Sequence, residues 1–167
     1  MRILVLGCSG SGKSTLSRAL GQALDVPVFH IDQLFWKENW VESSDEDLAA
    51  TLTEIAAMEH WIIDGNYSRF LSHRIDRAEE IIYIQLPRWQ NLWRVTKRYW
   101  KYRGRTRPDM TESCNEKLEL EFLIWIWNFS KRSHHKMITA IRESNKPATI
   151  LHSQKEINIF LQDRTSN

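Results

Sequence analysis

The sequence predicts an α/β fold in which a five-stranded parallel sheet is covered by helices on both faces. Five short β-rich runs alternate with longer segments of helical periodicity along the 167 residues. Parallel strands require long crossover connections, so this alternation predicts βαβ units. The strand-like run 3–6 is apolar throughout, as expected of a strand buried on both faces. The length is that of one ordinary domain, so we expect residues 1–167 to fold as a single domain.

The first half of the chain contains three of the expected strands. They are predicted at 3–6, 26–31 and 60–63, with helices at 14–24, 45–58 and 68–76. In the first helix Leu16 and Leu20 recur on one face, and Ser44 or Asp45 could cap the second helix. The turn-like cluster Asp64-Gly65-Asn66 ends the third strand.

The second half contains two more strands and longer helices. Strands are predicted at 80–86 and 147–151, and helices at 88–102, 115–142 and 156–161. The middle helix could be interrupted near Ser130, and we expect Trp125, Trp127 and Phe129 to pack it against the body. A polar, proline-containing loop, 104–111, precedes that helix. Because ligands of parallel sheets bind beyond the carboxyl ends of the strands, the segments that follow strands are candidate sites.

A glycine-rich phosphate-binding motif follows the first strand. Gly7-Cys8-Ser9-Gly10-Ser11-Gly12-Lys13-Ser14 matches the pattern G-x-x-x-x-G-K-[ST] in full, between an apolar strand and an amphipathic helix. Glycines let the backbone aim several N–H groups inward, and the helix N-terminus adds unpaired donors and a positive dipole end. The Lys13 ammonium would contact the β- and γ-phosphates of ATP, and the Ser14 hydroxyl would bind Mg²⁺. The residues expected to bind ATP are Gly7, Ser9, Gly10, Ser11, Gly12, Lys13, Ser14 and Thr15.

Two carboxylates follow neighbouring strands and are candidates for metal binding and catalysis. Asp64 could hold the Mg²⁺ or one of its waters, although an Asp-Gly pair is also a common turn. Asp32 could accept or orient the proton of an attacking hydroxyl group. Its structural alternative is to cap a short helix over 33–36. His30 fits a partly buried structural histidine better than a substrate ligand.

The segment 88–107 contains eight basic residues and no acidic residue. Arginines on a closing lid can neutralise the charge that develops on a transferred phosphoryl group, and closure excludes water. We therefore predict a lid over 88–132. Its arginines that we expect to be catalytic, together with Lys13 and Asp32, are Arg94, Arg98, Arg105 and Arg107. A solvated basic helix face and, because aromatic residues interleave with the charges, contact with nucleic acid are the two alternatives.

Composition narrows the class of protein. With 42% apolar residues the chain is too apolar to be disordered, and its net charge of +2 says little about partners. No apolar run approaches the ~20 residues that cross a bilayer, and the features of a signal peptide do not follow Met1. The two distant cysteines, Cys8 and Cys114, fit free thiols in a reducing compartment. The sequence thus predicts a cytoplasmic protein without a membrane partner.

Several segments together resemble one bacterial family. They are 7–15, Ile31-Asp32-Gln33-Leu34-Phe35-Trp36, 61–67, Leu92-Trp93-Arg94-Val95 and Gly104-Arg105-Thr106-Arg107-Pro108-Asp109-Met110. Through them, and over nearly its whole length, the chain resembles the DNA topology modulation proteins, which are similar to adenylate and shikimate kinases within the P-loop NTPase fold. The resemblance implies a three-layer α/β/α fold, a strand order of 2-3-1-4-5, and a helical lid between the fourth and the last strand.

The resemblance also bears on the phosphate acceptor. Asp64-Gly65-Asn66 resembles an Asp-Gly-Phe-Pro-Arg segment of nucleotide kinases but lacks its Pro and its Arg, for which Arg69 could substitute. This departure argues against a nucleoside monophosphate as the acceptor. Asp32 resembles the substrate-binding acid of shikimate-type kinases, which points to an acceptor hydroxyl group.

Three functions are open to these residues. The main prediction is a kinase that uses ATP and Mg²⁺ and phosphorylates a small molecule or a nucleotide. The alternative is a nucleotide-dependent DNA-binding regulator, motivated by the basic aromatic stretch and by the family's name, although no segment resembles a nuclease, a topoisomerase or a helix-turn-helix. A GTPase is disfavoured, because Asn145-Lys146-Pro147-Ala148 lacks the final Asp of the guanine-specificity motif and precedes its strand.

Overall fold

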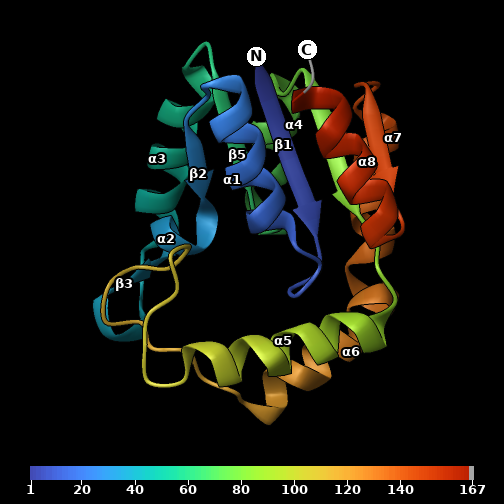
Figure 1. Cartoon of the computed structure of the whole chain (residues 1–167). Coiled ribbons are helices and arrows are strands. Elements are labelled where there is room, and N and C mark those ends of the chain that lie inside the picture. The colour runs from blue at the N-terminus through green and yellow to red at the C-terminus, as the bar shows by residue number, and fades with distance from the viewer. Residues whose placement is uncertain (166–167) are drawn as a thin grey trace.

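Five parallel strands form the central sheet of the computed structural model, which describes residues 1–165 (Figure 1). In their order along the sheet they are β2 (Val28–His30), β5 (Trp61–Asp64), β1 (Arg2–Gly7), β6 (Glu80–Ile84) and β7 (Ala148–Leu151). Every neighbouring pair is parallel. Counted along the chain, the sheet strands have the order 2-3-1-4-5, so the predicted fold class and strand order are confirmed.

The two faces of the sheet bury two hydrophobic cores, because successive side chains of a strand point to opposite faces. Ile3 and Val5 of β1 pack in one core with the two helices α1 (Lys13–Leu24) and α8 (Gln154–Thr165). Leu4 and Leu6 belong to the other core. That core is covered by α3 (Asp45–Ala57), α4 (Leu71–Arg77), α6 (Leu120–Arg132) and α7 (His134–Glu143). The result is the predicted arrangement of three layers.

Two helices begin where the sequence indicates. Ser44 caps α3, because its Oγ accepts a hydrogen bond of 3.0 Å from the N–H of Asp47. Helix α5 spans Arg88–Tyr102, which is the predicted range, and begins directly after Pro87. In Figure 1, α5 lies across the carboxyl ends of the strands, and the loop after β1 points towards it. Helix α5 therefore covers the edge of the sheet at which ligands are expected.

Two regions differ from the prediction. Of the segment 115–142 predicted as helical, residues 115–119 are non-helical, whereas the interruption considered near Ser130 is present at Ser133, between α6 and α7. Residues 31–42 form four short elements, namely α2 (Ile31–Phe35), β3 (Trp36–Lys37), η1 (Glu38–Trp40) and β4 (Val41–Glu42), of which the sequence suggests only a short helix, over 33–36. Each is too short to show a hydrophobic period. Another single turn, η2 (Ser68–Phe70), precedes α4.

The described residues also show where the cysteines lie and how apolar the helices are. Cys8 and Cys114 are both buried, free thiols. Cys8 belongs to the phosphate motif, and Cys114 belongs to the loop between α5 and α6. Within residues 1–165, every helix is too short or too polar to cross a membrane.

Candidate active site

The phosphate motif forms a tight loop between β1 and α1 that requires glycine at two positions. Gly10 and Gly12 have φ angles of 83° and 96°, in the left-handed region. A Cβ built on Gly10 would lie 2.4 Å from the carbonyl oxygen of Asn91 in α5, which leaves no room for a side chain. The glycines therefore shape the loop and let it pack closely against α5.

The end of this loop presents polar groups that lack protein partners. Gly12 is the N-cap of α1 and has no side chain that could accept from the N–H groups of the first turn. The Ser11 hydroxyl is buried and has no hydrogen-bond partner within residues 1–165. Lys13 and Ser9 line a cavity that begins at this point. Unpaired donors at a helix N-terminus beside a lysine fit a phosphate group, so the residues present suit ATP.

The side chain of Asn66 attaches the start of the phosphate loop to the end of β5. Its Oδ1 accepts a hydrogen bond of 3.1 Å from the N–H of Gly7, and its Nδ2 donates one of 2.8 Å to the Gly7 carbonyl. From the sequence alone, Asn66 is predicted only as a turn residue. Its positioning role depends on β1 and β5 being neighbours in the sheet, and no local pattern reports that.

A buried arginine of α4 holds the segment that follows β5. Arg74 is fully buried and donates to the carbonyl oxygens of Gly65 at 2.8 Å, Asn66 at 2.7 Å, Tyr67 at 3.1 Å and Phe70 at 3.2 Å. Burial lowers the pKa of Arg74 to about 9, which leaves the guanidinium charged at neutral pH. The sequence gives no signal for this residue, because an arginine in a helix is ordinarily exposed.

Asp64 lies on the predicted edge of the sheet, in a buried pair with His30. Oδ2 of Asp64 lies 2.8 Å from Nδ1 of His30, and the two side chains are 4% and 7% exposed. His30 is therefore a buried histidine with a structural partner. Within residues 1–165, no group of three or more His, Cys, Asp or Glu side chains could hold a metal ion. A Mg²⁺ ion would thus take most of its ligands from phosphates and water, as is common for this ion, and the role of Asp64 stays a prediction.

Asp32 lies in the first turn of α2 and not at its cap. His30 is the cap residue of α2, so the alternative in which Asp32 caps a helix over 33–36 is wrong. The Tyr67 hydroxyl donates a hydrogen bond of 3.2 Å to Oδ1 of Asp32. Burial and the nearby Asp32 charge raise the pKa of Tyr67, which therefore keeps its proton at neutral pH. Asp32 lines the same cavity as Lys13.

A cavity of about 950 Å³ extends from the phosphate loop to the segment predicted as a lid. Five of the predicted site residues line it, namely Ser9, Lys13, Asp32, Arg98 and Arg107. Aromatic side chains form much of the remaining wall, contributed by Trp36, Trp40, Tyr67, Phe122, Trp125 and Phe129. Of the aromatic residues expected to pack α6 against the body, Phe129 is buried, whereas Trp125 is 41% exposed and Trp127 is 45% exposed. A cavity of this size accommodates a small-molecule ligand.

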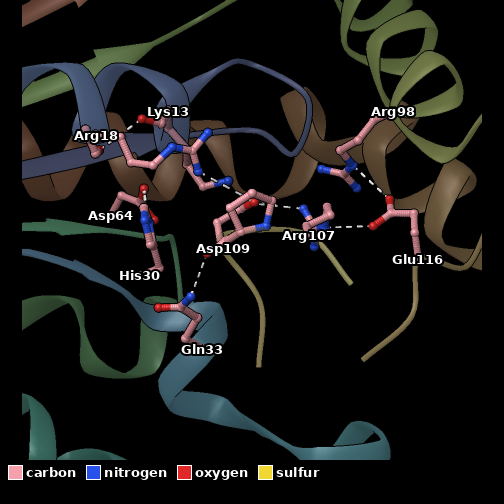
Figure 2. A network of polar contacts seen from close by, with 11 residues as sticks. Lys13, Arg18, His30, Gln33, Asp64, Arg98, Arg107, Asp109 and Glu116 are labelled. Atoms are coloured by element: carbon pink, nitrogen blue, oxygen red, sulfur yellow. Dashed lines mark hydrogen bonds and ion pairs between the residues drawn. The ribbon is translucent and has the colours of Figure 1, made fainter. Parts of the chain in front are cut away.

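Two of the predicted lid arginines share one carboxylate (Figure 2). Arg98 Nε donates a hydrogen bond of 2.8 Å to Glu116 Oε1, and Arg107 Nε lies 2.7 Å from Glu116 Oε2. Arg107 also lies 3.4 Å from Asp109, and Asp109 lies 3.7 Å from Arg18 of α1. The Glu116 side chain is 3% exposed and that of Arg107 is 8% exposed. A chain of alternating charges therefore connects α5, the following loop and α1.

These contacts shift the pKa values of two members of the network. Burial and the neighbouring Arg107 lower the pKa of Arg98. Burial alone would raise the pKa of Asp109, but attraction to Arg107, a backbone hydrogen bond and the charges of Arg18 and His30 together outweigh it, and the pKa of Asp109 is lowered. The carboxylate of Asp109 is therefore charged at neutral pH and can compensate Arg107.

The remaining arginines of the prediction lie in three different settings. Arg94 lies over the phosphate loop, where it donates to the Ser11 carbonyl at 3.2 Å and to a glutamine of α8 at 2.7 Å. Arg105 is exposed and does not line the cavity, so its catalytic role stays a prediction without support from its position. Arg69 is also exposed and pairs with Asp45, so it does not stand in for the missing arginine of the nucleotide-kinase segment.

Hydrogen bonds attach the loop between α5 and α6 to residues 31–42. Gln33 Nε2 donates to the Pro108 carbonyl at 3.0 Å. The Thr111 hydroxyl donates to two carbonyls of the 31–42 segment, and Cys114 Sγ donates to a carbonyl of β3 at 3.3 Å. The loop therefore forms one continuous wall with the segment that carries Asp32.

The Cys8 thiol is expected to react much more slowly in the folded protein than in the unfolded chain. Burial raises the pKa of Cys8 to about 12 against a smaller opposing effect of Lys13, so the reactive thiolate is scarce at pH 8. Alkylation by iodoacetamide at pH 8, followed by mass spectrometry with and without guanidinium chloride, measures the difference. Equal rates in the two conditions would contradict the expectation.

One family model matches more than half of the chain. It is described as "AAA domain" and covers residues 3–119, a range that includes the phosphate motif, Asp32, Asp64 and the predicted lid arginines. No curated protein matches the sequence. The family model does not name the DNA topology modulation proteins, so that resemblance stays a prediction.

Solved structures of several kinases share the fold. The shikimate kinase from Bacteroides thetaiotaomicron is 17% identical, with 99% of this chain and 97% of that chain covered and a TM-score of 0.61. The shikimate kinase from Acinetobacter baumannii, in complex with shikimate, is 16% identical, with 99% and 93% covered and a TM-score of 0.59. A gluconokinase from Sinorhizobium meliloti 1021 is 15% identical, with 99% and 89% covered and a TM-score of 0.57. At these identities the likeness establishes a kinase-like P-loop fold.

Proposed function

The chain belongs to the AAA domain family, and from this premise we propose that it is a P-loop kinase that transfers the γ-phosphate of ATP to a hydroxyl group of a small acceptor. One observation carries the proposal. Lys13 of the phosphate loop, the carboxylate of Asp32 and the guanidinium groups of Arg98 and Arg107 all line one cavity. A phosphate-binding lysine, a candidate proton acceptor and charges that stabilise a transferred phosphoryl group are the parts that such a reaction needs.

The phosphate loop would hold the donor. The backbone of Gly7 to Ser14 would bind the phosphates, with Ser14 and, through water, Asp64 holding Mg²⁺. Mg-ATP, when bound, supplies the transferable phosphoryl group. Arg94 lies over the loop, at 3.2 Å from the Ser11 carbonyl, where its charge would stabilise negative phosphate oxygens. The similar shikimate kinase and gluconokinase structures support this assignment, because they share this fold over nearly the whole chain.

Asp32 would act on the acceptor. The acceptor's hydroxyl oxygen forms the new bond to the γ-phosphorus as the bond to the bridging oxygen of ADP breaks, and Asp32 takes the hydroxyl proton. The hydrogen bond from Tyr67 fixes one carboxylate oxygen of Asp32 and so orients the other. Residues 88–132 would serve as the lid of a single domain, because α5 lies across the carboxyl ends of the strands (Figure 1) and both α5 and the following loop contribute lining residues to the cavity. Closure of such a lid would exclude water.

Replacement of Asp32 by asparagine is expected to lower kcat by about a hundredfold, because the amide cannot accept the acceptor's proton. ATP affinity is expected to be unchanged, since Asp32 lies on the acceptor side of the cavity. Steady-state kinetics and nucleotide titration measure the two quantities. Asp25→Asn is the matched control, since Asp25 is exposed at the C-terminus of α1 and asparagine tolerates its left-handed conformation. Equal losses in both variants would contradict the role of Asp32.

The direct test of the proposed function needs only the unmodified protein. Mg-ATP at a hundred times its dissociation constant is expected to add about 2.7 kcal/mol to the free energy of unfolding, which a thermal shift detects. Radiolabelled ATP, incubated with nucleosides, sugars and other small hydroxy compounds, then reports transfer to an acceptor. An absence of both ATP-dependent stabilisation and acceptor-stimulated turnover would overturn the proposal.

A second candidate function, nucleic-acid binding, is favoured by the outer face of α5. Trp89, Trp93 and Trp100 are 65%, 59% and 65% exposed. Lys97 lies 5.1 Å from the ring of Trp93, and Arg103 lies 5.7 Å from the ring of Trp100. Exposed aromatic rings beside cations are the groups that stack on bases and contact phosphates. Filter binding of single-stranded and duplex DNA across a salt series decides the question, with a steep salt dependence expected for real phosphate contacts and no binding at low salt removing the candidate.

A further inference from the structure

Two aromatic pairs line the cavity in the part that we assign to the acceptor. Trp36 and Trp40 have ring centroids 5.3 Å apart at an interplanar angle of 70°. Phe122 and Trp125 of α6 are stacked, with centroids 6.0 Å apart at 9°. Both pairs line the cavity together with Tyr67. Aromatic faces carry negative electrostatic potential, so this surface attracts cations as well as apolar groups.

Carboxylates outnumber basic groups in this part of the cavity. Apart from Lys13 of the phosphate loop, the lining contains the four acids Asp32, Glu42, Glu116 and Glu119 and the three bases Arg98, Arg107 and Lys117. Glu42 and Glu119 form no ion pair within the part of the chain that the structure describes. Both are exposed and therefore free to contact a bound molecule. The negative charge available to a ligand is thus larger than the positive charge.

The two arginines of the cavity are already paired with carboxylates of the protein. Arg98 and Arg107 share Glu116, at 2.8 and 2.7 Å, and Arg107 also contacts Asp109 at 3.4 Å. Arg18 also lies 3.7 Å from Asp109, so each of the two carboxylates is shared between two guanidinium groups. The remaining N–H groups of Arg98 and Arg107 can still contact the transferred phosphoryl group, but much of their charge is balanced by Glu116 and Asp109, which makes them weaker partners for an anionic acceptor.

An ammonium group of the protein already lies against one of these rings. Lys117 Nζ is 5.6 Å from the ring centroid of Trp40, within the range of a cation–π contact. Lys117 is exposed, and it makes no ion pair among residues 1–165. The contact shows that the face of Trp40 accepts an ammonium group, and an exposed lysine is a group that a ligand cation can replace.

We propose that the acceptor is a positively charged alcohol, an ammonium compound that carries the hydroxyl group to be phosphorylated. The aromatic faces of Trp36, Trp40 and Trp125 and the carboxylates of Glu42 and Glu119 hold its cationic end. Its hydroxyl group reaches Asp32 at the phosphate loop. This inference rests on the proposed kinase function and deepens it by naming the charge class of the acceptor.

The test is a comparison of matched probes that differ in charge, bound to the full chain without nucleotide. One series consists of glucosamine, glucose and glucuronate, and the other consists of choline, 3,3-dimethylbutanol and 3-hydroxybutyrate. Isothermal titration is expected to give the lowest Kd for the cation of at least one series, by about tenfold over its neutral counterpart. Equal affinities, tighter binding of the anions, or binding by no probe would overturn the inference.

Variants locate the binding. The double variant Glu42→Gln with Glu119→Gln is expected to remove the preference for the cation, and Trp40→Leu is expected to weaken cation binding by about tenfold. The control is Glu38→Gln with Glu112→Gln, which removes the same charge from two exposed acids outside the cavity. A preference that survives in the first double variant, or is lost in the control, would contradict the site.

Because these titrations contain no ATP, they separate the two proposals. Cation-selective binding without ATP-dependent phosphorylation of any probe, in a protein that ATP does not stabilise, would remove the kinase function and keep the charge preference of the cavity. Stabilisation by ATP together with binding that favours anions would keep the phosphate site and remove the inference about the acceptor.

Discussion

Replacement of Lys13 by alanine is expected to reduce phosphoryl transfer by about a thousandfold, or about 4 kcal/mol of transition-state stabilisation. Lys13 begins α1 and lines the cavity, next to the unpaired donors of the phosphate loop. Within the described chain its ammonium group has no ion pair, so its charge is available to the phosphates. The lost charge would be felt most in the transition state, where negative charge spreads over the transferred group.

Single-turnover kinetics with the best acceptor measures this loss, and a thermal melt without nucleotide checks the fold. Since the Lys13 side chain supports no other residue, the melting temperature is expected to be unchanged. Lys136→Ala removes an equivalent charge from the exposed surface of α7 and is expected to retain full activity. Transfer at the unmodified rate in Lys13→Ala would show that the phosphate loop does not serve the reaction.

Replacement of Arg74 by methionine is expected to lower the free energy of unfolding by about 4 kcal/mol. Methionine is an unbranched, flexible apolar side chain that is shorter than arginine and donates no hydrogen bonds, so four backbone carbonyls lose their donor. A hydrogen bond to a charged group contributes roughly 1.5–3 kcal/mol, and the four are not additive because they share one guanidinium group. Removal of the desolvation cost of the charge offsets part of the loss.

A melting temperature lower by about 10–15 °C is the corresponding thermal effect for a chain of this size. Arg77→Met tests the same change three residues later in α4, where the side chain is exposed, and is expected to shift the melting temperature very little. An Arg74→Met melting curve that coincides with that of Arg77→Met would contradict the assigned role. Because Arg74 holds the backbone of Tyr67, which orients Asp32, the variant is also expected to lose activity at temperatures at which it remains folded.

The sheet and its helices could be predicted from the sequence because their signals are local. The apolar run 3–6 predicts a strand buried on both faces, and its side chains do point alternately into the two cores. Helix α5 matches its predicted range because Pro87 marks its start. The error over 115–142 has a physical cause. Several of residues 115–119 favour helices. Glu116 nevertheless forms ion pairs with Arg98 and Arg107, and residues 115–119 are non-helical. Tertiary contacts outweighed local preference there.

The candidate site was predictable where a motif fixes it and not where the fold assembles it. The phosphate loop is predicted by the motif that residues 7–14 match in full. The position of Asp32 in the cavity lining agrees with the rule that ligands bind beyond the carboxyl ends of parallel strands. The Asn66 bonds to Gly7, the burial of Arg74 and the pairing of Glu116 with two arginines join residues far apart in the chain. Each depends on which strands and loops become neighbours, which a single sequence does not report.

The hydrogen bonds from Thr111 and Cys114 to the segment 31–42 have a kinetic consequence. If the loop between α5 and α6 opens as part of a lid, it either moves together with the segment 31–42 or first breaks its hydrogen bonds to that segment. Under the proposed function, the phosphorylated product would then leave only after a step that involves both sides of the cavity. If opening of this contact limits turnover of the proposed kinase, weakening the Thr111 hydrogen bonds is expected to speed product release and to admit water to the site of transfer.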